Sequence, residues 1–309
     1  MTENKDQYEY HVPVMLQECL DGLDIHPDGI YVDLTFGGGG HAREIFKRLS
    51  SKGKLIVFDQ DVDAKKNAWT APNFHFVASN FSFLKNQLRM LGISKVDGIL
   101  ADLGVSSHQF NEPERGFSIR SDEKLDMRMN QRSGDSAFDV VNGYDEEELL
   151  SVIGKYGEVK SPRRIAQAIC LKRQENPIET TGQLIEILEP IAPKFKENKF
   201  YAQVFQAIRI EVNDEMNVLE RMLEQTAEVL KPKGRLVVMS YHSLEDRLVK
   251  NYMKRGSFDG KIEKDFFGNI LKPFTEVTRK PIVANDDELE QNSRARSAKL
   301  RIAERNEGE

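Results

Sequence analysis

Four short apolar runs in the first third of the chain alternate with segments of helix length. The runs are bounded by turn residues and span 29–34, 54–59, 73–78 and 96–103. Helices are expected between them at about 41–49, 62–69 and 81–91. This alternation with short connections is typical of a parallel α/β sheet.

The alternation stops after the fourth run, at Asp102. The next run typical of a buried strand is 235–240, much farther along the chain than the roughly 30 residues of one strand–helix–strand unit. Three segments between them have helical periodicity: 145–156, 162–173 and 181–191. Gly157, Pro177 and Pro193 separate these segments. We therefore expect an inserted small all-helical domain.

The predicted domain ranges are 1–107 and 200–309 for the sheet domain, with the helical insertion at 108–199. Apolar residues at helical spacing predict one helix over 200–230 that returns the chain to the sheet. The turn Lys231-Pro-Lys-Gly234 ends that helix and leads into the late strand. Near the end, an acidic run at 286–290 precedes the basic segment 294–301, whose alternation predicts an exposed edge strand.

A glycine-rich turn, Gly37-Gly-Gly-Gly40, lies directly between the first strand and the first helix. Glycines let backbone approach a ligand closely, and a helix N-terminus offers unpaired N–H groups. Gly37, Gly39 and Ala42 also fit the dinucleotide pattern G-x-G-x-x-A. The turn alone predicts an adenosine-type cofactor and leaves its class open.

Acidic and aromatic residues at the strand ends narrow the cofactor class. Asp59 ends the second strand, where a carboxylate can accept hydrogen bonds from ribose hydroxyls in either class. Asp33 lies inside the first strand just ahead of the glycine turn, where dehydrogenases normally keep an apolar residue and methyltransferases keep an acid facing the ammonium of the methionine moiety. Phe81 and Asp102 add an aromatic for adenine and a carboxylate beside the reacting centre. S-adenosylmethionine is favoured, with an NAD-dependent oxidoreductase as the alternative.

Longer strings farther along the chain resemble one family. They are Asp102-Leu-Gly-Val-Ser-Ser107 with Gln109, Glu114-Arg-Gly-Phe-Ser118, Leu125-Asp-Met-Arg-Met129 and Ser240-Tyr-His-Ser-Leu-Glu-Asp-Arg247. Together with Thr35-Phe-Gly-Gly-Gly-Gly-His41 they resemble the bacterial ribosomal RNA small subunit methyltransferase H family. The resemblance spans nearly the whole chain.

The resemblance implies a class I, Rossmann-like methyltransferase sheet whose helical insertion recognises substrate. It implies methylation of N4 of a specific cytidine in the decoding region of 16S rRNA, with the small ribosomal subunit as partner, and it leaves a homodimer open. The cofactor residues that it carries over are Gly39, Gly40, His41, Asp59, Phe81, Asp102 and Gln109. Asp33 and Gly37 join them from the strand-end argument above.

The N4 amine of cytosine is a poor nucleophile because its lone pair is delocalised into the ring, so a hydrogen-bond acceptor must favour the pyramidal nitrogen. Asp102, Ser106 and Ser107 are the candidates by position, and no metal is needed. Because the target base must leave its stack and its phosphates need anchoring, Arg115 and Arg128 are candidate RNA contacts. Their alternative is pairing with nearby acids such as Glu114 and Asp126. His242 and Asp246, just beyond the late strand, are weaker candidates for the same site.

Composition sets limits on these hypotheses. A net charge of −6 argues against nucleic-acid binding over the whole surface. No segment approaches the roughly 18 consecutive apolar residues of a membrane span, so we expect a cytoplasmic protein without membrane contact. A second alternative is a non-catalytic RNA-binding or assembly factor that keeps a methyltransferase fold.

Overall fold

The computed structural model describes residues 13–105 and 112–307. The chain forms two compact units. The sheet unit comprises Met1–Asp59, Ala64–Gly104 and Leu223–Glu309, and the helical unit comprises Gln60–Asp63 and Val105–Met222. Ser106, Ser107 and Gln109 lie outside the described residues. Among the helices of 13–105 and 112–307, none is long and apolar enough to cross a membrane.

A seven-stranded sheet is the centre of the first unit and confirms the predicted fold class. Its strands are β1 (Ile30–Asp33), β2 (Lys54–Asp59), β3 (Phe74–Ala78), β4 (Val96–Asp102), β5 (Leu230–Ser240), β6 (Phe274–Glu276) and β7 (Lys299–Arg305). Their order is β3-β2-β1-β4-β5-β7-β6. The first five strands are parallel, and β7 is antiparallel to both neighbours. The ligand edge of such a sheet is where the parallel strands end.

The predicted exposed edge strand at 294–301 is wrong. Residues Ser293–Ser297 form a 3₁₀ turn (η5), and β7 then pairs with β5 on one side and β6 on the other. The alternating charges that suggested an edge are accommodated because Asp246 accepts a hydrogen bond from Arg301 Nε at 2.6 Å. The predicted turn at 231–234 lies within β5, which already begins at Leu230. The register between β5 and β4 shifts across this segment.

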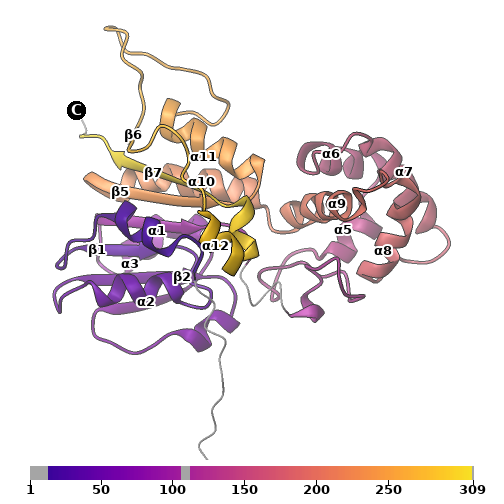
Figure 1. Cartoon of the computed structure of the whole chain (residues 1–309), viewed down its shortest axis with the longest axis horizontal. Coiled ribbons are helices and arrows are strands. Elements are labelled where there is room, and N and C mark those ends of the chain that lie inside the picture. Colours follow the sequence, from indigo (N-terminus) through magenta and orange to yellow (C-terminus); the bar gives the residue numbers. More distant parts are fainter. Residues whose placement is uncertain (1–12, 106–111, 308–309) are drawn as a thin grey trace, which may run out of the picture. The chain divides into compact units, whose positions relative to one another are not determined.

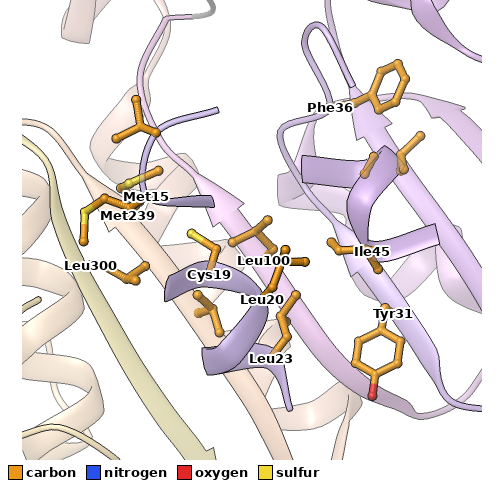
Figure 2. Close-up of a cluster of buried hydrophobic side chains, with 14 of the residues drawn as sticks. Met15, Cys19, Leu20, Leu23, Tyr31, Phe36, Ile45, Leu100, Met239 and Leu300 are labelled. Atoms are coloured by element: carbon orange, nitrogen blue, oxygen red, sulfur yellow. The ribbon is translucent and has the colours of Figure 1, made fainter. Parts of the chain in front are cut away.

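One face of the sheet packs under α1 (Leu16–Leu23) and α2 (Gly40–Lys47). Figure 2 shows Cys19, Leu20 and Leu23 of α1 beside Leu100 of β4. Side chains alternate along a strand, so Tyr31 and Asp33 share a face, as do Leu100 and Asp102. The apolar residues of this face therefore fill the core, and the carboxylates at the strand ends continue the same face.

Two connections in the sheet unit are shorter or more broken than expected. The helix expected at 62–69 is only the 3₁₀ turn η1 (Asp63–Asn67), where Asn67 is bound to the glycine loop. The expected helix at 81–91 is the 3₁₀ turn η2 (Phe81–Phe83) followed by α3 (Leu84–Met90). The C-terminal part adds α11 (Ser243–Arg255) and α12 (Asp286–Gln291).

Five α-helices and their core make up most of the helical unit (Figure 1). They are α5 (Ala137–Gly143), α6 (Glu146–Tyr156), α7 (Pro162–Lys172), α8 (Thr181–Leu188) and α9 (Glu197–Val212). The 3₁₀ turns η3 (Pro113–Arg115) and η4 (Glu189–Ile191) also belong to it. Capping boxes begin α5, α6 and α8. The helices α6 and α8 begin within one residue of the predicted starts at 145 and 181, whereas α5 was not predicted.

The single helix predicted over 200–230 is two helices, α9 and α10 (Glu215–Val229). The break follows from Asn213, whose amide donates to the Met127 and Arg209 carbonyls at 2.8 Å each. Asp214 then adopts a left-handed φ of 50°. Because the apolar side of α9 is buried in the core of the helical unit, that unit extends through residue 222 instead of ending at 199.

Candidate active site

The glycine turn between β1 and α2 has a backbone that side chains would disturb. Gly37 and Gly39 have φ values of 49° and 76°. A Cβ at Gly39 would lie 2.9 Å from the Phe36 ring, and one at Gly40 would lie 2.3 Å from Cγ of Pro13. Around Gly38 no atom would lie within 4 Å of an added Cβ. The turn therefore presents bare backbone at the N-terminus of α2, which fits close approach of an adenosine cofactor.

Asp59 at the end of β2 is tied to this turn. Its Oδ2 accepts a hydrogen bond from the Gly37 N–H at 2.8 Å. The Gly37 carbonyl in turn accepts one from the Asn67 amide at 2.9 Å. The carboxylate predicted to meet the ribose thus also fixes the shape of the glycine turn.

Asp33 is a buried carboxylate at the end of β1, 1% exposed. Its Oδ1 accepts a hydrogen bond from the Thr35 N–H at 3.0 Å, and it makes no ion pair within the part of the chain that the structure describes. Burial raises its pKa to about 6, against the opposing influence of His41 and of the Thr35 bond. A buried carboxylate without a cationic partner is suited to a ligand that brings a positive charge.

Asp102 at the end of β4 is held by two hydrogen bonds. The Tyr241 hydroxyl donates to Asp102 Oδ1 at 2.7 Å, and the Asp102 N–H donates to Thr35 Oγ1 at 2.7 Å. Asp102 Oδ2 lies 3.9 Å from His41 Nδ1, and the side chain keeps 24% of its surface exposed. Burial raises its pKa to about 7, the Tyr241 bond opposes this rise, and Glu245 adds to it. The carboxylate is fixed in place and partly accessible, and a pKa of about 7 leaves both of its protonation states populated near pH 7.

His41 of α2 is 7% exposed and connects this site to the start of α1. Its Nε2 lies 3.1 Å from the Val14 carbonyl oxygen. Since a carbonyl only accepts, we infer that Nε2 carries the proton. Burial lowers the pKa of the imidazole, which keeps it neutral. His41 therefore orders the cofactor turn, consistent with its position in the sequence motif.

Two residues at this site were not predicted. Tyr241 directly follows β5 and reaches the carboxylate of β4; Asp102 and Met239 are register partners. Thr35 connects Asp33 with the backbone of Asp102. The signal for Tyr241 was present, because it follows the late strand at the same sheet edge. Assigning it needed the strand order, which places β5 beside β4.

The remaining predicted cofactor residue, Phe81, begins η2 after β3 and is partly exposed. Asn80 caps this turn by accepting a hydrogen bond from the Ser82 N–H at 2.8 Å. A partly exposed ring at this strand end is available for stacking.

His242 and Asp246, the weaker candidates, have structural partners instead. His242 caps α11 in a capping box with Glu245. Asp246 accepts hydrogen bonds from Arg301 Nε at 2.6 Å and Lys299 Nζ at 3.3 Å. Both residues therefore stabilise the start of α11 and its contact with β7.

Both arginines predicted to contact RNA take part in ion pairs. Arg115 is 5% exposed, and its Nη1 lies 2.9 Å from Asp61 Oδ2. Arg128 donates from Nε and Nη2 to the two carboxylate oxygens of Asp126 at 2.9 Å each. The geometry agrees with the alternative of pairing with acids, although the partner of Arg115 is Asp61 and not its neighbour Glu114.

The chain was compared with known proteins. A sequence model of the MraW methylase family matches residues 8–306. The ribosomal RNA small subunit methyltransferase H of Parabacteroides distasonis is 59% identical over 304 residues, which cover 98% of this chain and 99% of that protein. The protein of that name from Bacteroides thetaiotaomicron is 56% identical over 301 residues, covering 97% and 99%.

Among solved structures, an rRNA methylase from Streptococcus thermophilus matches with a TM-score of 0.41 and 10% identity, covering 94% of this chain and 95% of that one. The sequence relationship carries the assignment, and it confirms the predicted family, enzyme class and cofactor. The chain belongs to the MraW methylase family and is an S-adenosylmethionine-dependent methyltransferase.

Proposed function

We propose that this enzyme methylates N4 of a specific cytidine in the decoding region of 16S rRNA, acting on the small ribosomal subunit in the cytoplasm. The names of the relatives support the ribosomal substrate. The proposed chemistry rests on one observation: the Asp102 carboxylate is held by Tyr241 and is partly exposed at the ligand edge of the sheet.

The cofactor would be held by the glycine turn and by the carboxylates on either side of it. The bare backbone at Gly37, Gly39 and Gly40 would accommodate the methionine moiety, and Asp33 would face its ammonium. Asp59 would accept hydrogen bonds from the ribose hydroxyls, and the partly exposed Phe81 ring would stack on adenine. Gln109, which lies outside the described residues, is assigned to the same site by its motif position.

Asp102 is assigned the role of acceptor for the amine. When bound, S-adenosylmethionine supplies an electrophilic methyl group, and the nitrogen that gains it releases one proton. An ionised Asp102 accepts a hydrogen bond from the amine, which favours the pyramidal nitrogen, and can then take that proton. The hydrogen bond from Tyr241 keeps the carboxylate in one orientation, so the acceptor is in place before the base arrives. Ser106 and Ser107 remain proposed additional acceptors.

The direct test is transfer of tritium from methyl-labelled S-adenosylmethionine into small subunits isolated from cells that lack this protein, followed by nucleoside analysis. Label in N4-methylcytidine is the expected result. Label in another nucleoside would overturn the proposed acceptor. No label, despite demonstrated cofactor binding, would favour the assembly-factor alternative.

Arg128, whose side chain is 26% exposed, is proposed to contact the RNA. Arg115 is too buried to reach a phosphate group of the RNA. The helical unit is proposed to recognise the substrate. A homodimer also stays a proposal, which light scattering during size exclusion would test by giving the mass of one or of two chains.

A further inference from the structure

The four residues that follow β2, the last of which begins η1, do not belong to the unit on either side of them in the sequence. Asp59 and Ala64 are part of the sheet unit, whereas Gln60–Asp63 are part of the helical unit. This segment begins directly after the carboxylate assigned to the cofactor ribose. Whatever fixes the segment therefore also limits where Asp59 can lie.

Arg115 fixes this segment. Its Nη1 donates to Asp61 Oδ2 at 2.9 Å across 54 positions of sequence, with both side chains almost fully buried. Its Nη2 donates to the carbonyls of Arg128 at 3.0 Å and Met129 at 3.2 Å. The other carboxylate oxygen of Asp61 accepts from the Asp63 N–H at 3.0 Å, which closes the turn. One guanidinium thus joins the turn after β2 to the 125–129 segment.

A second contact reinforces the first. The Gln60 amide lies 3.4 Å from the Met129 sulfur, so two consecutive residues after Asp59 are held by the same part of the helical unit. Two residues of chain span at most about 7 Å, so a shift of Asp61 must be passed to Asp59 or absorbed by strain in Gln60. Asp59 in turn holds the glycine turn through the Gly37 N–H.

The pair is not arranged for stability alone. Burying an ion pair costs much of the attraction that it gains, and apolar replacements of similar volume are often equally stable. The Nε of Arg115 is buried and has no hydrogen-bond partner among the described residues, which adds to that cost. What the guanidinium contributes, and an apolar residue would not, is a directed link between two segments.

We propose that Arg115 is a positioning residue for the cofactor, which acts through Asp61 on the turn after Asp59 and so sets the ribose-binding carboxylate. The proposal rests on the cofactor assignment of Asp59 and makes cofactor affinity depend on a residue of the helical unit. Its test uses cofactor binding and not methyl transfer, so it can fail while the proposed RNA substrate stands, and the reverse.

The experiment is calorimetric titration of the full-length protein with S-adenosylhomocysteine. Arg115→Met should weaken binding about tenfold or more, because the turn loses its anchor. Asp61→Asn, which keeps the bond to the Asp63 N–H, should weaken it to a similar extent. The matched control is Arg209→Met, which breaks a largely buried bidentate pair with Glu215 in the same unit. That variant should lose thermal stability while its affinity stays within about twofold of the wild type.

Since Arg115→Met removes the guanidinium that faces the buried charge of Asp61, the variant could fail to fold. The double variant Arg115→Met with Asp61→Asn removes that charge and should recover thermal stability without recovering affinity. Affinity within about twofold of the wild type in this folded double variant would overturn the proposal. A second readout is additivity: Asp59→Asn and Arg115→Met should combine to less than the sum of their effects, because both act on one contact. Full additivity would also overturn it.

Discussion

Asp126 of the helical unit faces an arginine, whereas Asp33 and Asp102 of the sheet unit have neither arginine nor lysine as an ion-pair partner within the described chain. The pKa values diverge accordingly. Burial is the largest single influence and acts to raise the pKa of Asp126, but the hydrogen bonds and charge of Arg128, together with the charge of Arg115, outweigh it, and the net shift is downward. Burial raises the pKa of Asp33 to about 6 and that of Asp102 to about 7.

This difference in pKa distinguishes carboxylates that stabilise the fold through an ion pair from buried carboxylates that are available to a ligand. A carboxylate matched by an arginine is satisfied in the free protein, and removing either partner disturbs structure. A buried carboxylate without a cation lowers the stability of the free protein, and a positively charged cofactor is what relieves it. Substituting a member of an ion pair in the helical unit should therefore lower stability. Substituting an unpaired carboxylate in the sheet unit should instead lower activity without lowering stability.

The largest effect is expected at Asp102. Asp102→Asn keeps an oxygen for the Tyr241 hydroxyl but cannot take a proton, so methyl transfer should fall about 100-fold or more. Affinity for S-adenosylhomocysteine should fall much less, and thermal stability should not fall. Single-turnover transfer to small subunits, together with calorimetry, measures both quantities. Full turnover at saturating cofactor would remove Asp102 from the chemistry.

Asp33→Asn should stabilise the free protein while weakening cofactor binding. The folded pKa of Asp33 exceeds the unfolded one, so the wild type loses stability as pH rises from about 4 through about 6. At pH 8 the variant should be more stable by about 2 to 3 kcal/mol, and near pH 4 the advantage should vanish. Urea unfolding at the two pH values checks the sign. Equal stabilities at pH 8 would contradict the unpaired-charge interpretation.

Tyr241→Phe should move the pH dependence of methyl transfer. The lost hydroxyl removes the bond that opposes the rise in the pKa of Asp102, so that pKa should increase further. At pH 7 the kcat/KM should fall about three- to tenfold, and it should recover at higher pH, with cofactor affinity unchanged. A loss of the same size at every pH would show that Tyr241 acts only on structure.

The smallest effect is expected at Arg128. Its pair with Asp126 is partly exposed, so Arg128→Met should cost no more than about 1 kcal/mol of stability. If the side chain also contacts phosphate, binding to small subunits should weaken modestly and its dependence on salt should become shallower by about one unit of slope. Filter binding at several salt concentrations measures both, and an unchanged salt slope would remove Arg128 as a contact.

The sheet and most site residues could be predicted because strand ends are local signals. Asp33, Asp59 and Asp102 each end an apolar run of the sequence, and parallel strands bring those ends to one edge. The helical insertion followed from the position at which the alternation stops. Both inferences needed only nearest neighbours in the sequence.

What could not be predicted depends on pairs far apart in the chain. The partner of Arg115 is 54 positions away, and its adjacent acid Glu114 suggested a different pair. Tyr241 is separated from Asp102 by 139 positions. The break between α9 and α10 is set by Asn213, which donates a hydrogen bond to the Met127 carbonyl and accepts one from the Met129 N–H, and helical periodicity does not reveal such distant bonds. Charge alternation in β7 suggested an edge because the compensating Asp246 lies on another element.

The pH dependence of kcat/KM for the wild-type enzyme tests the central claim most directly, because it measures whether the ionisation of Asp102 controls transfer. The account predicts a rate that rises about tenfold per pH unit at acidic pH, levels off near the pKa of about 7, and is low and flat in Asp102→Asn. A wild-type rate that stays constant from about pH 5.5 to about pH 8.5 would contradict it, because the carboxylate would then have no part in accepting the amine.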